Sequence, residues 1–223
     1  MNLRYARNIP ALSEEECHLL KTKRIFIAGC GGTGGHLLEL LARIGIGSIR
    51  AVDNDIFDVS NFNRQSLSEP SLIGVRKADA AALRVTRINP DVNIEGICAF
   101  IDENNVSALL EGVDVVFDAL DNIESRKILA KACSDAGIPY IYGAVQGWVA
   151  QCAIFMPGDY LMDRLYPTGS TLTDSSILSF TPALCASVQV SLCIKYLTGH
   201  PIETGKLYYF DLLNQEFETI PLR

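Results

Sequence analysis

The stretch Arg24-Ile-Phe-Ile-Ala-Gly-Cys-Gly-Gly-Thr-Gly-Gly35 decides the fold of this 223-residue chain. A short apolar strand leads directly into glycines that are spaced as G-x-G-x-x-G, at Gly29, Gly31 and Gly34. Apolar residues then recur at helical spacing until Gly45, which is typical of a helix end. This order favours a nucleotide site, because the glycine turn lets a phosphate approach the exposed amides of the helix N-terminus. A glycine turn of purely structural use is the alternative.

Strand-like and helix-like segments continue to alternate on the C-terminal side of this turn. Strands are expected at 24–28, 48–53, 94–100, 114–119 and 139–144, and helices at 76–87 and 125–136. Beyond Trp148, strands at 149–155, 206–212 and 216–221 are expected to be antiparallel, and a buried helix is predicted over 183–197 after Thr181 as cap. The sequence therefore predicts a Rossmann-like α/β fold, with a mainly parallel sheet, helices on both faces and an antiparallel C-terminal extension.

The composition excludes several classes of protein. With 48% hydrophobic and 20% charged residues, the chain is neither disordered nor a disulfide miniprotein. A net charge of −7 gives no general attraction to nucleic acid or to an anionic membrane. We find no signal peptide or convincing membrane span, and the seven cysteines form no C-x-x-C pair, as expected for buried thiols in a reducing compartment. We therefore expect a cytoplasmic protein without a nucleic-acid or membrane partner.

Polar residues that suit a nucleoside triphosphate follow the glycine turn. Asp53 ends the next predicted strand, where an acid can accept hydrogen bonds from a ribose hydroxyl. Asn61, Arg64, Gln65 and Lys77 come soon after, and the two cations are suited to neutralising a polyphosphate. A dehydrogenase does not need two cations here, so an NAD-dependent oxidoreductase is supported by the glycine spacing alone. Taken singly, each cation could also be a solvated surface charge.

Two acids, Asp118 and Asp121, lie at the carboxyl end of another predicted strand, where open α/β sheets place their ligands. Asp121 is suited to Mg²⁺, which takes one or two protein carboxylates together with phosphate oxygens and water. The alternative is that Asp121 or Asn122 caps the following helix. Asp118 could serve only to buttress the turn.

Four blocks occur in a fixed order along the chain: the glycine loop, D-x-D…S-N-x-x-R-Q at 53–65, G-x-x-K at 74–77 and D-x-x-D-N-x-x-S-R at 118–126. In this order the sequence resembles the ThiF/MoeB/HesA family, whose domain is shared with ubiquitin-activating enzymes. The likeness extends from R-Y-A-R-N at 4–8 to K-Y-L-T-G at 195–199. It implies a single ThiF-type adenylation domain over 1–223, with an N-terminal helical arm at 1–22 and a mobile crossover loop at 160–180.

The resemblance implies that the protein binds ATP with Mg²⁺. The C-terminal glycine carboxylate of a small ubiquitin-like sulfur-carrier protein ending in Gly-Gly would attack the α-phosphate, forming an acyl-adenylate and pyrophosphate. The family includes enzymes of thiamine and molybdopterin biosynthesis. Because a carboxylate is already ionised, the reaction needs no general base, and His18, His36 and His200 need no catalytic role. A different acceptor, such as a modified tRNA base or a peptide C-terminus, and a nucleotide-binding homologue without catalysis are the alternatives.

The same resemblance assigns roles to residues at matching positions. Arg7, Arg64, Lys77 and Asp121 would be catalytic, with Asp121 holding Mg²⁺ and Arg7 reaching the γ-phosphate across a homodimer interface. The residues implied in nucleotide binding are Gly29, Gly31, Gly32, Gly34, Asp53, Asp55, Asn61, Arg64, Gln65, Lys77 and Asn122.

The chain also departs from the family pattern. Many relatives carry two C-x-x-C pairs that bind structural zinc, and this sequence has neither, so we predict no zinc. The segment 160–180 contains no cysteine that could accept the acyl group, and Cys185 lies inside the predicted apolar helix, where we expect a packing role. A reaction that ends at the acyl-adenylate is therefore predicted.

Overall fold

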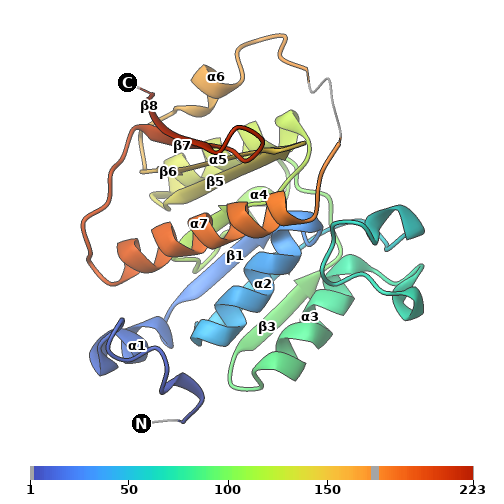
Figure 1. The fold of residues 1–223 in the computed structure, drawn as a ribbon, viewed down its shortest axis with the longest axis vertical. Coiled ribbons are helices and arrows are strands. Elements are labelled where there is room, and N and C mark those ends of the chain that lie inside the picture. The colour runs from blue at the N-terminus through green and yellow to red at the C-terminus, as the bar shows by residue number, and fades with distance from the viewer. Residues whose placement is uncertain (1–2, 172–175, 223) are drawn as a thin grey trace.

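The computed structural model describes residues 3–171 and 176–222, which build a single mixed sheet with helices on both faces (Figure 1). The strand order is β3-β2-β1-β4-β5-β6-β7-β8. The first five strands in sequence are parallel, and β6 to β8 are antiparallel to their neighbours. The predicted fold class is thereby confirmed. The strands are β1 (Arg24–Ala28), β2 (Ser48–Val52), β3 (Asn93–Ile97), β4 (Val115–Asp118), β5 (Tyr140–Gln146), β6 (Val149–Phe155), β7 (Lys206–Asp211) and β8 (Glu216–Pro221).

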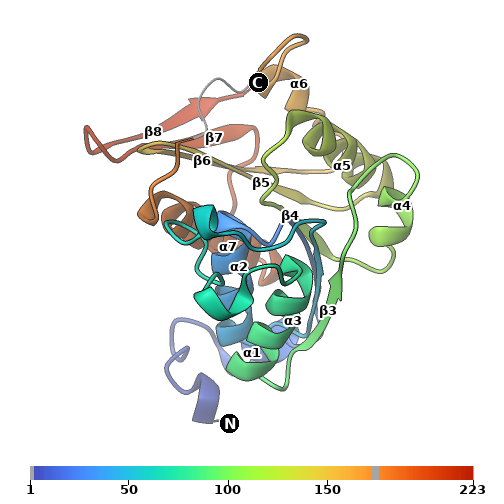
Figure 2. The ribbon, with the colours of Figure 1, turned by 90° about the vertical axis from the view of Figure 1, so that its right-hand side faces the viewer.

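The helices form two layers (Figure 2). One face of the sheet is covered by α2 (Gly32–Ile44), α3 (Lys77–Ile88) and α7 (Phe180–Leu197). The other face is covered by α4 (Val106–Leu109) and α5 (Ile123–Ala136), with the short α6 (Met162–Leu165) against α5. Near the N-terminus, α1 (Glu14–Leu20) follows a 3-10 turn at Leu3–Tyr5. Because the sheet is covered on both sides, its central strands are apolar on both faces, and Ile25, Phe26, Ile27 and Ala28 of β1 are all buried.

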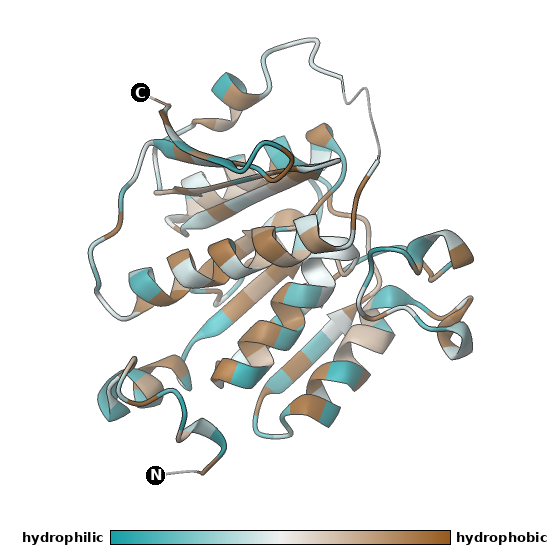
Figure 3. Cartoon of the chain, viewed as in Figure 1, coloured by the Kyte–Doolittle hydropathy of each residue, from teal (hydrophilic) through white to brown (hydrophobic). Residues whose placement is uncertain are grey.

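The helix α7 is the most apolar of the long helices, and brown residues follow it in Figure 3. By length and composition alone it could cross a membrane. It packs against α2, β5 and β6, and Cys185, Gln189 and Cys193 on it are fully buried. This packing is that of a core helix, which is also apolar around most of its surface.

Some predicted boundaries are wrong. The helix α7 begins at Phe180, and Thr181 does not cap it but donates its hydroxyl hydrogen bond to the Gly147 carbonyl at 2.8 Å. A contact with a distant hairpin thus replaces the expected local cap. The strand predicted at 94–100 ends at Ile97, because Ile97 pairs with Val52, the last residue of β2.

The predicted crossover loop at 160–180 includes the helix α6 and the N-terminal turn of α7. Two of its residues, Leu161 and Met162, are buried in the core. Residues 172–175 of this predicted loop lie outside the described residues. Its mobility therefore stays a prediction.

Candidate active site

A cavity of about 570 Å³ opens at the carboxyl ends of β1, β2, β4 and β5. The boundary between β1 and β4 is where the chain reverses its direction of travel across the sheet, the position where open α/β sheets bind ligands. Most of the residues assigned by the sequence line this cavity: Gly29, Gly31, Gly32, Asp53, Asp55, Arg64, Gln65, Lys77, Asp121 and Asn122.

The glycine turn places the N-terminus of α2 at the cavity wall. Gly29 has a φ of +95°, and a Cβ there would lie 2.5 Å from the Ala119 carbonyl oxygen. A Cβ on Gly34 would lie 1.9 Å from the Gly29 carbonyl oxygen, so Gly34 lets α2 pack against the end of β1 and does not line the cavity. The first amides of a helix have no partner within it. At the start of α2 they are available to an anion.

Asp53 joins the end of β2 to the glycine turn. One carboxylate oxygen accepts a hydrogen bond from the Cys30 amide at 2.7 Å, and the other accepts one from the Asp55 amide at 2.8 Å. Burial raises the pKa of Asp53, while these amide hydrogen bonds oppose that rise. Each oxygen keeps a second lone pair, which a ribose hydroxyl can use.

The two predicted cations both reach the cavity. The Nζ atom of Lys77 lies 3.0 Å from a carboxylate oxygen of Asp55. Arg64 donates hydrogen bonds of 2.9 Å to the Ser60 carbonyl and to the Asn63 side chain. Neither partner of Arg64 carries a charge, so its positive charge is not neutralised by these contacts.

Asn61 and Gln65 flank Arg64 and are both buried. The Oδ1 atom of Asn61 accepts a hydrogen bond from the Asp58 amide at 3.0 Å, so Asn61 holds the turn before Arg64 and does not line the cavity. Among the described residues, the buried Oε1 atom of Gln65 has no hydrogen-bond partner. A buried amide oxygen without a partner beside a glycine loop fits a site whose ligand completes it.

Asp121 and Asn122 lie on the loop after β4. Asn122, rather than Asp121, caps α5, because its Oδ1 atom accepts a hydrogen bond from the Ser125 amide at 2.8 Å. Asp121 is exposed in the cavity wall. The described residues contain no cluster of three or more metal-ligating side chains. One carboxylate nevertheless fits Mg²⁺, which takes its other ligands from phosphates and water.

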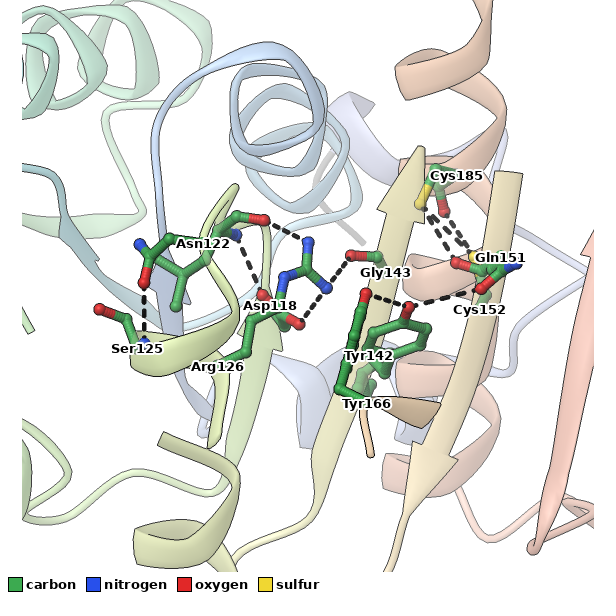
Figure 4. A network of polar contacts seen from close by, with 12 residues as sticks. Asp118, Asn122, Ser125, Arg126, Tyr142, Gly143, Gln151, Cys152, Tyr166 and Cys185 are labelled. Carbon is green, nitrogen blue, oxygen red and sulfur yellow. Dashed lines mark hydrogen bonds and ion pairs between the residues drawn. The ribbon is translucent and has the colours of Figure 1, made fainter. Parts of the chain in front are cut away.

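A buried ion pair supports this loop from below (Figure 4). Arg126 lies 2.8 Å from Asp118, and it also donates hydrogen bonds to the carbonyls of Gly143 and Leu120. Burial raises the pKa of Asp118, whereas Arg126 lowers it. Burial alone would lower the pKa of Arg126, but Asp118 and the neighbouring tyrosines together raise it. Asp118 therefore buttresses the turn, as one sequence interpretation proposed, and Arg126 is its partner.

The cavity continues beyond the residues next to the glycine turn into a part that the sequence did not reveal. Tyr142 and Gln151 from the β5–β6 hairpin line it, together with Tyr166 from the segment after α6 and Phe100 after β3. Arg126 also lines it and is the last residue of the D-x-x-D-N-x-x-S-R block, which was the one available signal. Tyr142 lies in an apolar run that indicates core, and Tyr166 lies in a segment without periodicity.

Arg7 lies far from the cavity of its own chain. Tyr5, two residues before Arg7, packs against Gly45. Gly45 directly follows the C-terminal end of α2, whereas the N-terminal end of α2 is at the cavity. A helix of 13 residues spans about 20 Å, too far for an arginine side chain to bridge. Arg7 is exposed and does not line the cavity.

All seven cysteines are free, and Cys185 is buried in α7. Its sulfur lies 3.5 Å from that of Cys152. Neither residue lines the cavity.

The model of the ThiF family matches residues 5–223. Similar proteins include the SAMP-activating enzyme E1 of Haloferax volcanii, at 32% identity over 99% of this chain and 85% of that protein. The sulfur carrier protein ThiS adenylyltransferase of Bacillus subtilis is 34% identical over 88% of this chain, which spans 60% of that protein. The molybdopterin-synthase adenylyltransferase of Escherichia coli is 29% identical over 91% of this chain and 84% of that protein.

Solved structures share the fold. Escherichia coli MccB with ATP superposes with a TM-score of 0.84 at 21% identity, over 100% of this chain and 72% of that chain. The Escherichia coli tRNA N6-threonylcarbamoyladenosine dehydratase TcdA, also with ATP, has a TM-score of 0.75 at 23% identity, over 88% of this chain and 94% of that chain.

Proposed function

Because the chain belongs to the ThiF family and is an adenylyltransferase of the ThiF/MoeB type, we propose that it activates the C-terminal glycine carboxylate of a ubiquitin-like sulfur-carrier protein. The carboxylate attacks the α-phosphate of ATP, and the products are an acyl-adenylate and pyrophosphate. One observation carries the proposal: the N-terminus of α2, Asp53, Arg64 and Lys77 all border a single cavity.

The cavity residues suit the electrostatics of this reaction. A carboxylate and a phosphate repel each other, and negative charge moves onto the leaving pyrophosphate. The amides at the start of α2, with Arg64 and Lys77, are placed to bind the polyphosphate and to stabilise that charge. Asp121 would hold Mg²⁺, which neutralises phosphate charge when it is bound. The Asp53 carboxylate orients the ribose, so the α-phosphate is fixed relative to the acceptor.

We propose that the protein works as a homodimer. The exposed Arg7 is about one helix length from the cavity of its own chain. A second copy can bring its own Arg7 to this cavity, where a further cation would bind the γ-phosphate. Mixing an inactive Arg7→Ala protein with an inactive Lys77→Met protein tests this, since hybrid dimers would regain one complete site.

The sulfur-carrier acceptor is supported by the relatives, whose names specify ThiS, SAMP and molybdopterin synthase. The similarity to MccB and TcdA concerns the fold, so a peptide C-terminus or a modified tRNA base is an alternative outcome of the test below. The net charge of −7 disfavours tRNA. We further propose a cytoplasmic location, in line with the free cysteines, and no structural zinc, which metal analysis of the purified protein tests.

ATP–pyrophosphate exchange tests the proposal, measured with and without ubiquitin-like carriers that end in Gly-Gly. We expect exchange that depends on a carrier and disappears when the two glycines are removed from it. Exchange with tRNA or a peptide alone would reassign the acceptor. ATP binding without exchange for any acceptor would indicate a nucleotide-binding homologue without catalysis. Binding of NAD with a higher affinity than ATP would favour an oxidoreductase.

A further inference from the structure

Two tyrosine hydroxyl groups meet in the cavity wall, one from β5 and one from the segment after α6. The hydroxyls of Tyr142 and Tyr166 lie 2.8 Å apart, and the Tyr142 hydroxyl also lies 3.5 Å from the Oε1 atom of Gln151 (Figure 4). All three residues line the same cavity as the glycine turn. The acyl chain of the adenylate proposed above would lie along this wall.

Tyr142 is a fixed part of that wall. Its ring is 1% exposed and stacks on Phe155, with ring centres 5.9 Å apart and an angle of 9° between the planes. The guanidinium of Arg126 lies 5.3 Å from the ring centre and is itself held by Asp118. A side chain packed between a ring and a buried ion pair has little freedom to move.

Tyr166 is less deeply buried than Tyr142. Its ring meets Tyr142 edge-on at 6.2 Å between centres, and its amide donates to the Met162 carbonyl at 2.9 Å. Residues 167–171, which follow it, are all exposed. Tyr166 therefore occupies cavity space at the edge of the core.

We propose that Tyr166 is a specificity-determining residue that selects acyl chains without a side chain at the penultimate position. The Tyr166 ring fills the volume that such a side chain would need. The Tyr166 hydroxyl, held by its contact with the buried Tyr142 hydroxyl, forms a hydrogen bond with a peptide group of the acyl chain, which a chain of glycines exposes fully. This inference depends on the adenylation proposed above.

The test uses two stable analogues of the acyl-adenylate, in which a sulfamoyl group replaces the phosphate: glycylglycyl-sulfamoyladenosine and leucylglycyl-sulfamoyladenosine. Their dissociation constants are measured by calorimetry on the full chain. We expect the wild type to prefer the glycylglycyl analogue by about tenfold or more, since even one extra methylene in a closed pocket changes affinity by about that factor. In Tyr166→Ala the preference should fall below about threefold.

Two further variants separate ring volume from other effects. Tyr166→Phe keeps the ring, so it should keep the preference while binding both analogues more weakly by up to about tenfold. Tyr160→Ala is the matched control, because Tyr160 is an exposed tyrosine of the same segment and does not line the cavity. It should behave as the wild type.

The outcomes distinguish the two proposals. If neither analogue competes with ATP, the adenylation proposal fails. If both compete, the inference alone is overturned by a wild type without preference, by Tyr166→Ala with an unchanged preference, or by Tyr166→Phe without preference.

Discussion

Two pairs of a cation and a carboxylate border the same cavity and have similar lengths, 3.0 Å for Lys77–Asp55 and 2.8 Å for Arg126–Asp118. They differ in the carboxylate. The Asp55 side chain is 55% exposed, whereas that of Asp118 is fully buried. Water can therefore take the place of Lys77 beside Asp55, but water has no access to Asp118.

The difference indicates two uses for the same chemistry. The buried Lys77 can exchange Asp55 for a polyphosphate, because the exposed Asp55 carboxylate regains water when the pair opens. A fully buried pair adds little net stability but is costly to break, because the remaining charge stays buried. Arg126 also binds two carbonyls, so it holds the loop with Asp121 and the β5 wall in place.

Arg126→Met should give the largest effect on stability. It leaves the Asp118 carboxylate buried without its cation, and we expect a loss of about 3–5 kcal/mol in the free energy of unfolding. Denaturant titration measures this. The double variant Asp118→Asn/Arg126→Met removes the buried charge and should recover much of the loss. A single variant as stable as the wild type would contradict a structural role for the pair.

Lys77→Met should give the largest effect on catalysis without comparable unfolding. Methionine keeps an apolar stem of similar length but removes the charge, and loss of one such electrostatic contact lowers rates by about 10²–10³-fold. ATP–pyrophosphate exchange measures this, and the free energy of unfolding should change by less than about 1 kcal/mol. Lys131→Met, which breaks a pair with Asp135 on α5 outside the cavity, is the matched control and should retain exchange. If Lys77→Met retained exchange, the polyphosphate would have to bind away from Lys77.

Asp121 belongs to neither pair, so its substitution tests the proposed Mg²⁺ site without breaking either ion pair. Asp121→Asn should raise the Mg²⁺ concentration needed for half-maximal exchange by at least about tenfold, because even supporting residues of metal sites change affinity by that factor. Chelating the divalent ion should stop exchange in the wild type. An unchanged Mg²⁺ titration in Asp121→Asn would mean that another group holds the ion.

Asp55→Asn should give the smallest effect. The Asp55 carboxylate is more than half exposed, and the buried Lys77 keeps the attraction of the nearby Asp53 carboxylate, so the free energy of unfolding should change by less than about 1 kcal/mol, in contrast to the buried pair. Chemical denaturation of this variant beside Arg126→Met compares the two pairs directly. A loss as large as that of Arg126→Met would show that exposure does not distinguish them.

The side of the cavity around the glycine turn could be predicted from sequence because its residues lie at strand ends. Gly29 and Asp121 come just after a predicted strand and Asp53 ends one, and parallel strands bring those ends to one edge of the sheet. Spacing along the chain was therefore enough to place these residues together.

The opposite wall could not be predicted in this way. Arg126, Tyr142 and Tyr166 come from α5, β5 and the segment after α6, and their meeting depends on the strand order and on packing. The start of α7 was mispredicted for the same reason, since Thr181 bonds a carbonyl of a distant hairpin instead of capping its own helix. Rules based on neighbouring residues in the sequence cannot predict contacts between segments that are distant in the chain.

A crystal structure of the protein with ATP and Mg²⁺ tests the central claim most directly. We predict that the Nζ atom of Lys77 leaves Asp55 for a phosphate oxygen, that Arg64 also contacts the polyphosphate, and that Arg126 keeps its bond to Asp118. Nucleotide bound elsewhere, with Lys77 still on Asp55 and Arg64 directed into solvent, would contradict the account.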